Sequence, residues 1–242
     1  MTWWGRLLRS GRLDGVIVRL VEAATAHESD ALLELIAAAG LPCVCLERPP
    51  DPRFGFDSVL FDNVAGAEAA TRLLVESGHR RIAHLQGDPL YESARERRRG
   101  YEQALVAAGL AVDPALIIGD SWDPTTVDDG IERLIGLPEP PTAIFAANDN
   151  LAFRAIGVLH LLGRRVPEDV AVVGFDDIPL AHEMVPPLST VRIPLDEIGR
   201  RAARRLLELI DTSPPDGQPP SEPPGSGQSE LIVPHLVRRS TA

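Results

Sequence analysis

An alternation of short apolar runs with longer amphipathic stretches constrains the fold of this chain more than any other feature of the sequence. The apolar runs have the length of β-strands, and in order they are DGVIV, LPCVCL, SVLF, RIAHLQG, ALIIGD, TAIFAAND, VAVVGFDD and STVRI. Helical periodicity marks most of the stretches between them, over residues 30–39, 65–77, 94–108, 124–135, 151–162 and 195–210. Strands that alternate with helices predict an α/β fold in which helices cover both faces of parallel sheets.

A glycine follows five of the predicted helices, where a left-handed residue commonly ends a helix. These glycines are Gly40, Gly78, Gly109, Gly136 and Gly163. Near the C-terminus, residues 212–229 are rich in Pro, Gly and Ser and contain no large apolar residue. That composition predicts a flexible segment between the last helix and a final strand, ELIVPHLV.

Composition and charge exclude several classes of protein. Hydrophobic residues make up 44% of the 242-residue chain and charged residues 24%, as in ordinary globular proteins. No apolar run is long enough to cross a bilayer, and MTWWGRLLRSGR is too short and too charged for a secretory signal. We therefore expect a cytoplasmic protein that makes no membrane contact. The net charge of −11 argues against direct DNA binding, and we interpret the arginines of residues 94–100 as a solvated helix face.

Cys43 and Cys45 are the only cysteines. Residues two apart in a strand point to the same face and cannot form a comfortable disulfide, and no neighbouring His or third Cys completes a zinc site. The sequence predicts two buried thiols, with no metal and no cofactor.

Polar side chains follow several of the predicted strands. In open parallel sheets, ligands bind beyond the carboxyl ends of the strands. These residues are Asn148 and Asp149 at the end of TAIFAAND, Asp176 and Asp177 at the end of VAVVGFDD, and Ser93, Arg95 and Arg97, toward which RIAHLQGD leads. Carboxylate, amide and guanidinium groups together suit the hydroxyls of a polyol, and flat aromatics such as Trp122 and Phe175 can cover a sugar ring. The set contains no nucleophile, so we expect no catalytic residues.

Each of these residues also has a structural interpretation. Asn148 is a favoured type of helix N-cap, and we prefer a loop-fixing role for Asp177. Arg95 and Arg97 taken alone resemble surface charge, and Trp122 alone is typical of packing. Their shared position at strand ends favours the binding interpretation.

With these motifs in hand, the chain resembles the effector-binding domain of the lac-repressor (LacI/GalR) family of bacterial transcription regulators. The resemblance runs in order over nearly the whole chain, and GHRRIAHLQG and VPEDVAVVGFDDIPLA are its most specific stretches. It implies the two-lobed fold of periplasmic sugar-binding proteins, with three crossovers between lobes and a ligand in the interlobe cleft.

The resemblance also implies roles for individual residues. Arg97 matches the arginine that grips sugar hydroxyls, and Ser93 heads the same motif. Asn148 and Asp176 match an amide and a carboxylate that hydrogen-bond the same ring.

Two further residues are carried over on weaker grounds. Trp122 falls near a position where relatives often have a stacking aromatic, and Asp62 lies in a DN pair close to the cleft. The chain also departs from the family at Ile193, where many members have Gln, so one polar contact is lost.

Lobe boundaries follow from the same resemblance. We expect a first lobe at residues 1–87 with 191–211 and a second at residues 88–190 with 230–242. Arg97, Asn148 and Asp176 then belong to the second lobe.

The resemblance begins after the family's helix-turn-helix headpiece, hinge and first strand. It implies a homodimer that senses a small sugar-like effector and binds operator DNA only through an N-terminal headpiece that this chain lacks. A wrong start site or a gene fragment explains this most simply, and a headless sensor is the alternative.

The competing functions are a solute receptor for a transporter, disfavoured by the lack of a signal peptide, and an α/β enzyme. For an enzyme the chain lacks G-x-S-x-G, Walker and G-x-G-x-x-G motifs.

Overall fold

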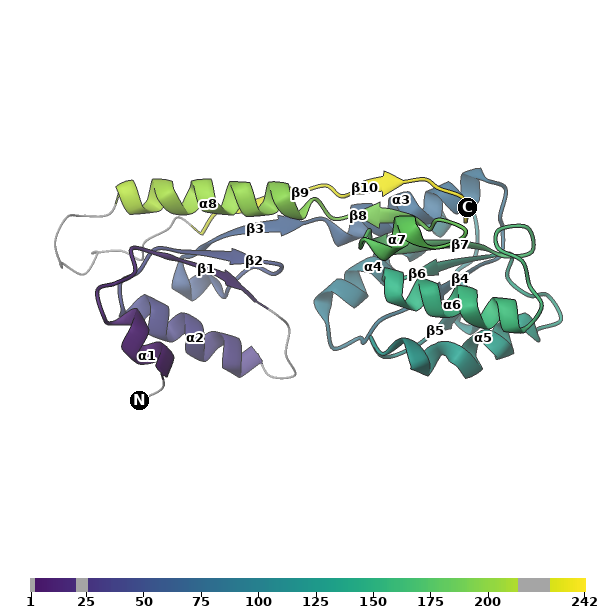
Figure 1. Ribbon diagram of the computed structural model, residues 1–242, viewed down its shortest axis with the longest axis horizontal. Helices are drawn as coiled ribbons and strands as arrows, with labels where there is room; N and C mark the ends of the chain where they lie inside the picture. The colour runs from purple at the N-terminus through teal and green to yellow at the C-terminus, as the bar shows by residue number, and fades with distance from the viewer. Residues whose placement is uncertain (1–2, 21–25, 213–226) are drawn as a thin grey trace. The chain divides into compact units, whose positions relative to one another are not determined.

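The computed structural model of the chain describes residues 3–20, 26–212 and 227–242 (Figure 1). It divides into two compact units, Met1–Phe61 with Pro194–Ile232 and Asp62–Ile193 with Val233–Ala242. The backbone therefore passes from one unit to the other after Phe61, after Ile193 and after Ile232. Among the described residues, no helix combines the length and the apolar character needed to span a membrane.

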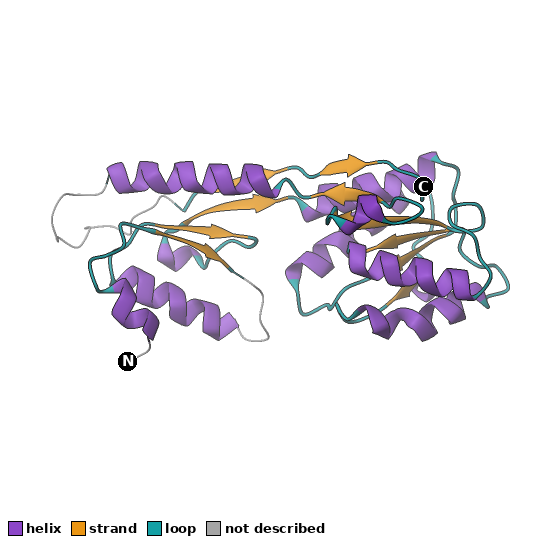
Figure 2. Ribbon diagram, in the orientation of Figure 1, coloured by secondary structure: helices purple, strands orange, loops and turns teal. Residues whose placement is uncertain are grey.

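The described part of the first unit forms a four-stranded sheet, in the order β1-β2-β3-β9, with all these strands parallel. Its elements are α1 (Trp3–Leu8), β1 (Val16–Arg19), α2 (Ala26–Ala38), β2 (Cys43–Leu46), the 3-10 turn η1 (Pro52–Phe54), β3 (Asp57–Phe61), α8 (Leu195–Asp211) and β9 (Ser229–Ile232). Figure 2 shows α2 and α8 on opposite faces of this sheet.

The two faces of that sheet are covered in different ways. Cys43 and Cys45 are fully buried and carry free thiols, as the sequence predicts, and they lie on the face that packs with α2. On the side of α8, Arg205 Nε donates to Asp57 Oδ2 at 2.7 Å. Because Asp57 is 1% exposed and sits in β3, this ion pair ties the helix to the sheet.

The second unit has a six-stranded sheet in the order β10-β8-β7-β6-β4-β5, and among its described strands only the β8–β10 pair is antiparallel. Its helices and turns are α3 (Asn63–Glu76), α4 (Glu92–Ala107), η2 (Pro114–Leu116), η3 (Pro124–Val127), α5 (Asp128–Ile135), α6 (Asp149–Leu161) and α7 (Leu180–Glu183). Its strands are β4 (Ile82–Leu85), β5 (Ile117–Ile118), β6 (Ala143–Ala146), β7 (Ala171–Asp176), β8 (Ser189–Arg192) and β10 (His235–Val237).

Alternate residues of the central strands face opposite helical layers. On β4, the His84 ring stacks between Tyr101 of α4 and Phe145 of β6, with centroids 5.0 Å apart in both cases. Ala83 and Leu85, the residues on either side of His84, join the apolar core formed with α5 and α6. Strands buried on both faces read as continuous apolar runs in the sequence, which explains why these strands were easy to predict.

The order of the strands places a topological switch point in this sheet. β4 lies between β5 and β6, so the chain leaves β4 toward one edge and returns on the other side. In doubly wound sheets, such a point opens a crevice beyond the carboxyl ends of the strands. Here those ends are Leu85 of β4 and Ala146 of β6.

Several boundaries differ from the expected ones. Residues 62–87, expected in the first lobe, lie in the second unit, because α3 packs on α4 and β4 pairs with β5 and β6. The final run ELIVPHLV is two strands, and β9 belongs to the first unit while β10 belongs to the second. Most of the predicted flexible segment, residues 213–226, lies outside the described residues.

The glycine prediction is right at four of its five positions. Gly40, Gly78, Gly109 and Gly163 have φ of 68°, 100°, 70° and 70°. Gly136 has φ −82°, so the chain leaves α5 in a right-handed turn instead.

Candidate functional site

Arg97 is buried at the carboxyl edge of the second sheet. It lies on α4, the helix that follows β4, and is 5% exposed. Its Nε donates to Asn63 Oδ1 at 2.9 Å, and its Nη1 donates to the carbonyl oxygen of Ala147 at 2.6 Å and to Asp176 Oδ1 at 3.2 Å. These bonds join α3, α4 and the ends of β6 and β7 around one guanidinium group.

The Phe175 ring packs against that guanidinium. Arg97 Cζ lies 3.9 Å from the centroid of this ring, a cation–π contact between partners that are both desolvated. Phe175 is fully buried, and a Cβ on Gly66 of α3 would come within 2.8 Å of it. The expectation that Phe175 could cover a sugar ring is therefore wrong, because α3 and Arg97 already cover it.

Asp176 and Asp177 have different surroundings although they are adjacent. The Asp176 side chain is 30% exposed and pairs with Arg97. The Asp177 side chain is 4% exposed and pairs with Arg192 and Arg239. The loop-fixing role preferred for Asp177 agrees with this geometry, and Asp176 is the carboxylate that solvent reaches.

Trp122 lies in the loop between β5 and η3, close to Arg97. Its ring centroid is 5.8 Å from Arg97 Cζ and 6.1 Å from the Tyr91 ring, which it meets edge-on. The ring also rests on the backbone of Gly87, where a Cβ would come within 2.4 Å of it. Trp122 is half-buried against the core of the second unit, so it both packs and offers a partly exposed aromatic surface.

Asn148 and Asp62 are helix caps. Asn148 Oδ1 accepts from the amide of Leu151 at 2.8 Å at the start of α6, and Asp62 Oδ1 accepts from the amide of Ala65 at 2.9 Å at the start of α3. The capping interpretation of Asn148 is therefore correct for its side-chain oxygen, Oδ1. A ligand contact by Asn148 stays a prediction that rests on its amide nitrogen.

Ser93 lies one turn before Arg97 on α4, so the two side chains share a helix face.

Asn63 was not predicted from the sequence, where the preceding residue of the same DN pair, Asp62, was selected instead. Asn63 is 3% exposed and connects Arg97 to Glu96, because its Nδ2 lies 3.0 Å from Glu96 Oε2. An Asn directly after a strand was the available signal.

Asp149, the residue after Asn148, is fully buried beneath the Asp176 loop. Its Oδ1 accepts from the Thr190 hydroxyl at 2.5 Å and its Oδ2 from the Ile178 amide at 2.9 Å. Burial raises the pKa of the Asp149 carboxyl to about 7, although both hydrogen bonds oppose this.

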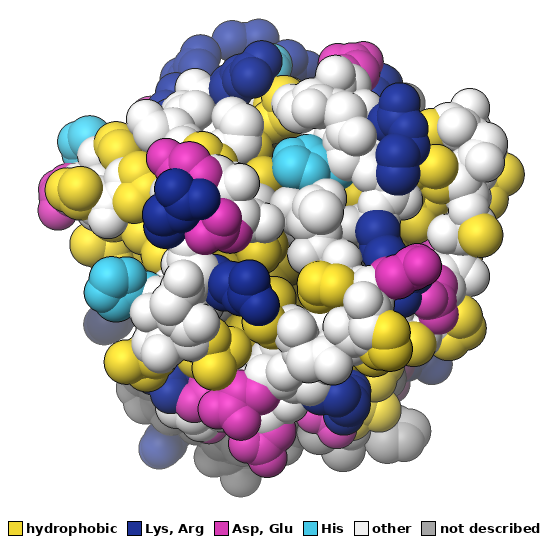
Figure 3. Space-filling model, turned by 90° about the vertical axis from the view of Figure 1, so that its right-hand side faces the viewer, with side chains coloured by type: hydrophobic (Ala, Val, Ile, Leu, Met, Phe, Trp, Pro, Cys, Tyr) yellow, Lys and Arg dark blue, Asp and Glu magenta, His cyan; other side chains and the backbone are white. Residues whose placement is uncertain are grey.

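Charge is mixed on the surface of the second unit. Basic, acidic and apolar side chains are interspersed over most of the face drawn in Figure 3, and several basic side chains lie together along its top edge. On α4, Arg98 pairs with Glu102 and Arg99 with Glu96, which agrees with the predicted solvated face. Arg97 is the buried exception.

Known proteins share this fold. Residues 71–242 match the family described as a periplasmic binding protein-like domain. The solved transcriptional regulator CelR–cellobiose complex has a TM-score of 0.79 and 33% identity, and the match covers 98% of this chain and 68% of that one. A sugar-binding LacI-family regulator from Escherichia coli, complexed with phosphate, has a TM-score of 0.79 and 30% identity over 98% of this chain and 80% of that one. The chain belongs to the LacI family of transcriptional regulators.

Curated relatives of this LacI-family chain include CelR of Thermobifida fusca, 37% identical over 85% of this chain and 59% of the relative. ExuR of Bacillus subtilis is 31% identical over 95% of this chain and 66% of the relative. The chain thus spans about three fifths to two thirds of the length of these proteins. They are named as a transcriptional regulator and a probable transcriptional repressor, not as enzymes, in agreement with the prediction of a LacI-type, non-enzymatic protein.

Proposed function

We propose that this LacI-family chain senses a small sugar, which Arg97, Asp176 and Trp122 bind in the second unit. The observation that carries this proposal is the Arg97–Asp176 pair, held at the switch point with a half-buried indole beside it. A guanidinium and a carboxylate side by side can donate to and accept from neighbouring hydroxyls of one ring. Ser93, Asn148 and Asp62 are the further predicted contacts.

The charge balance of the site favours a neutral ligand. Arg97 and Asp176 offset each other, so neither a free anion nor a free cation finds an unopposed partner in the pair. The Trp122 face suits the apolar C–H surface of a sugar ring, and Tyr91 at right angles to it extends the aromatic wall. Because the relative CelR was solved as a complex with cellobiose, cellobiose is the first sugar to test.

The proposal includes a regulatory step. A ligand shifts a conformational equilibrium only by its differential affinity for the two states, so the sugar must bind one arrangement of the two units better than another. In a homodimer, that shift would alter operator binding by a headpiece of the kind that characterises the family.

The direct test is calorimetry and thermal melting of the purified chain with cellobiose and a panel of pentoses, hexoses, disaccharides and nucleosides. A ligand at about a hundred times its Kd adds about 2.7 kcal/mol of stability, which corresponds to a rise in Tm of roughly 5–10 °C. Asp176→Asn removes a charge-assisted acceptor, and we expect it to weaken binding about tenfold or more. We expect Trp122→Ala to have a similar effect.

Asp129→Asn is the matched control, because Asp129 is an exposed carboxylate on α5 of the same unit. Its Kd should equal that of the unmodified chain. A panel in which no sugar raises Tm, or a sugar that binds Asp176→Asn and Trp122→Ala with unchanged affinity, would contradict the proposal.

A further inference from the structure

The loop after β7 has an unusual backbone. Asp176 and Asp177 have φ of 110° and 59°, two successive non-glycine residues in the left-handed half of the map. Asp tolerates the left-handed helical region better than most residues, yet such a conformation persists only where its surroundings impose it. The contacts that hold this loop therefore determine where the Asp176 carboxylate points.

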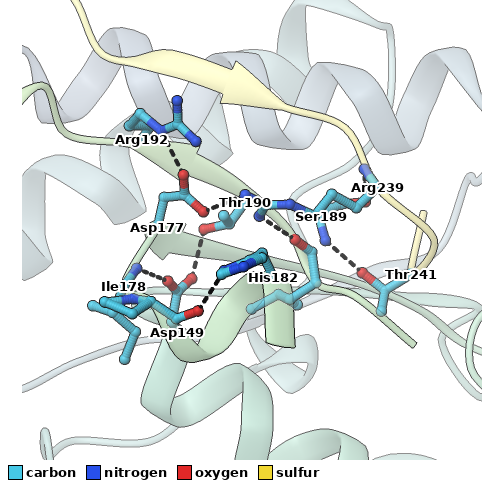
Figure 4. Close-up of polar contacts among 11 residues, drawn as sticks. Asp149, Asp177, Ile178, His182, Ser189, Thr190, Arg192, Arg239 and Thr241 are labelled. Atoms are coloured by element: carbon cyan, nitrogen blue, oxygen red, sulfur yellow. Dashed lines mark hydrogen bonds and ion pairs between the residues drawn. The ribbon is translucent and has the colours of Figure 1, made fainter. Parts of the chain in front are cut away.

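Two arginines clamp Asp177 from different parts of the chain (Figure 4). Arg192 Nε, at the end of β8, donates to Asp177 Oδ2 at 2.5 Å. Arg239 follows β10 near the C-terminus, and its Nη2 lies 2.7 Å from Asp177 Oδ1. Both carboxylate oxygens of Asp177 are thus engaged, and its side chain is 4% exposed.

The C-terminal segment, residues 238–242, is itself anchored in the sheet. The amide of Arg239 donates to Ser189 Oγ at 2.9 Å, and its Nη1 donates to the carbonyl oxygen of Leu188 at 2.7 Å. Thr241 is fully buried, and its hydroxyl donates to the carbonyl oxygen of Val172 at 2.7 Å and accepts from the amide of Ser189 at 2.8 Å. The segment lies against β7 and β8 and presents the Arg239 side chain to Asp177.

Asp149 holds the other end of the same loop. It accepts from the Ile178 amide, one residue beyond Asp177, and from the Thr190 hydroxyl on β8. The two residues after Asp176 are therefore tied down independently, one by ion pairs and one by a buried carboxyl.

We propose that Asp177 and Arg239 are positioning residues for the sugar site. The C-terminal segment sets the orientation of Asp176 through the Arg239–Asp177 pair, without touching the ligand. This inference rests on the proposed function, and it adds that ligand affinity depends on the C-terminal segment, residues 238–242.

The test compares Arg239→Ala with Arg238→Ala, using hydrogen–deuterium exchange on the ligand-free chain and calorimetric titration with cellobiose or the tightest-binding sugar of the panel. Arg238 is the matched control, because it is the adjacent arginine of the segment and its Nε donates to the carbonyl oxygen of Ala242. For Arg239→Ala we expect at least tenfold faster exchange at the Ile178 amide and about tenfold weaker sugar binding. Arg239→Lys keeps the positive charge and should recover part of the exchange protection and part of the sugar affinity. Arg238→Ala should change neither the exchange rate at the Ile178 amide nor the affinity.

Exchange and affinity in Arg239→Ala that match the Arg238→Ala control would overturn the proposal. If Arg239→Ala does not fold, Asp177→Asn takes its place, because Asn also tolerates the left-handed region. A chain that binds no sugar of the panel refutes the proposed function alone. In that case exchange at the Ile178 amide still decides whether Arg239 positions the loop.

Discussion

Arg97 and Asp176 are 79 residues apart in the sequence, and their side chains meet at 3.2 Å. One comes from the helix that follows β4 and the other from the last residue of β7, two strands away in the same sheet. A parallel sheet produces this meeting, since it brings the carboxyl ends of all its strands to one edge.

Removal of the Arg97 side chain should destabilise the second unit. Arg97→Ala leaves Asn63 Oδ1 and the carbonyl oxygen of Ala147 without their donor in a buried setting. Each unsatisfied buried group costs about 1–3 kcal/mol, so we expect the free energy of unfolding to fall by about 3 kcal/mol in urea titrations. Arg98→Ala, on the exposed face of the same helix, should stay within about 0.5 kcal/mol of the unmodified chain. Equal stability of the two variants would contradict this account.

Helix α3 approaches β7 closely only because residue 66 is glycine. A Cβ there would lie 2.8 Å from the Phe175 ring, so Gly66→Ala should lower the free energy of unfolding by about 1–3 kcal/mol. Gly157→Ala provides the comparison, because Gly157 is also within a helix and has nothing within 4 Å of its would-be Cβ. That variant should be more stable by about 0.5–1 kcal/mol, and a stabilising Gly66→Ala would refute the packing argument.

His84 should make the chain sensitive to acid. Its Nδ1 lies 3.0 Å from the carbonyl oxygen of Phe145, and its Nε2 has no hydrogen-bond partner among the described residues. Burial, with smaller contributions from nearby arginines, lowers the pKa of His84 to about 4. The folded state therefore resists protonation that the unfolded chain accepts below pH 6.5, the ordinary value. The contribution of neutral His84 to the free energy of unfolding is fully present above about pH 6.5. It falls by about 3 kcal/mol as the pH drops to about 4.

Urea titrations of His84→Gln between pH 7.5 and 4.5 test this. The variant should be less stable at neutral pH but should lose this component of the acid sensitivity. His160→Gln, at an exposed position on α6, should behave as the unmodified chain does. An identical acid slope in His84→Gln and the unmodified chain would count against the buried neutral imidazole.

Asp149 should make the chain more stable at acidic pH, which is the opposite of the effect expected for His84. Its pKa in the folded chain is raised to about 7 from an ordinary value of 3.8, mainly by burial and further by the nearby Asp176 and Asp177. The stability from this group is fully present below about pH 3.8 and is lost as the pH rises through about 7. Compared with Asp149→Asn, the unmodified chain should gain about 1 kcal/mol per pH unit on acidification within this window. A parallel pH profile for the two proteins in urea titrations would exclude a protonated Asp149.

The strands and helices were predictable because burial on both faces produces continuous apolar runs and glycines mark most helix ends. The assignment of α3 to the second unit was not predictable, because the pattern of an amphipathic helix is the same whichever sheet the helix covers. The relevant signal was the run of small residues in VAGAEAA, since a Cβ on Gly100 of α4 would come within 2.3 Å of the Val64 carbonyl oxygen. Such close approach requires glycine and alanine, and it attaches α3 to α4.

The place of the site was easier to predict from the sequence than the contacts within it. Asp176 ends β7 and Arg97 lies on the helix that follows β4. Both were found, because a strand end is visible as a change from apolar to polar residues. The Ala147 carbonyl was missed, since a backbone acceptor has no sequence signature. Asn63 was missed because the preceding Asp62 of the same DN pair was selected instead. Phe175 was misread because the two faces of a fully buried strand look alike in the sequence, and only the structure says which face an aromatic ring occupies.

β9 and β10 belong to different sheets but are separated by only Val233 and Pro234. An inserted or deleted residue at this junction would shift β9 against β3 or β10 against β8, and so would disturb the pairing of one sheet or the other. Natural insertions and deletions among homologues should therefore avoid this dipeptide.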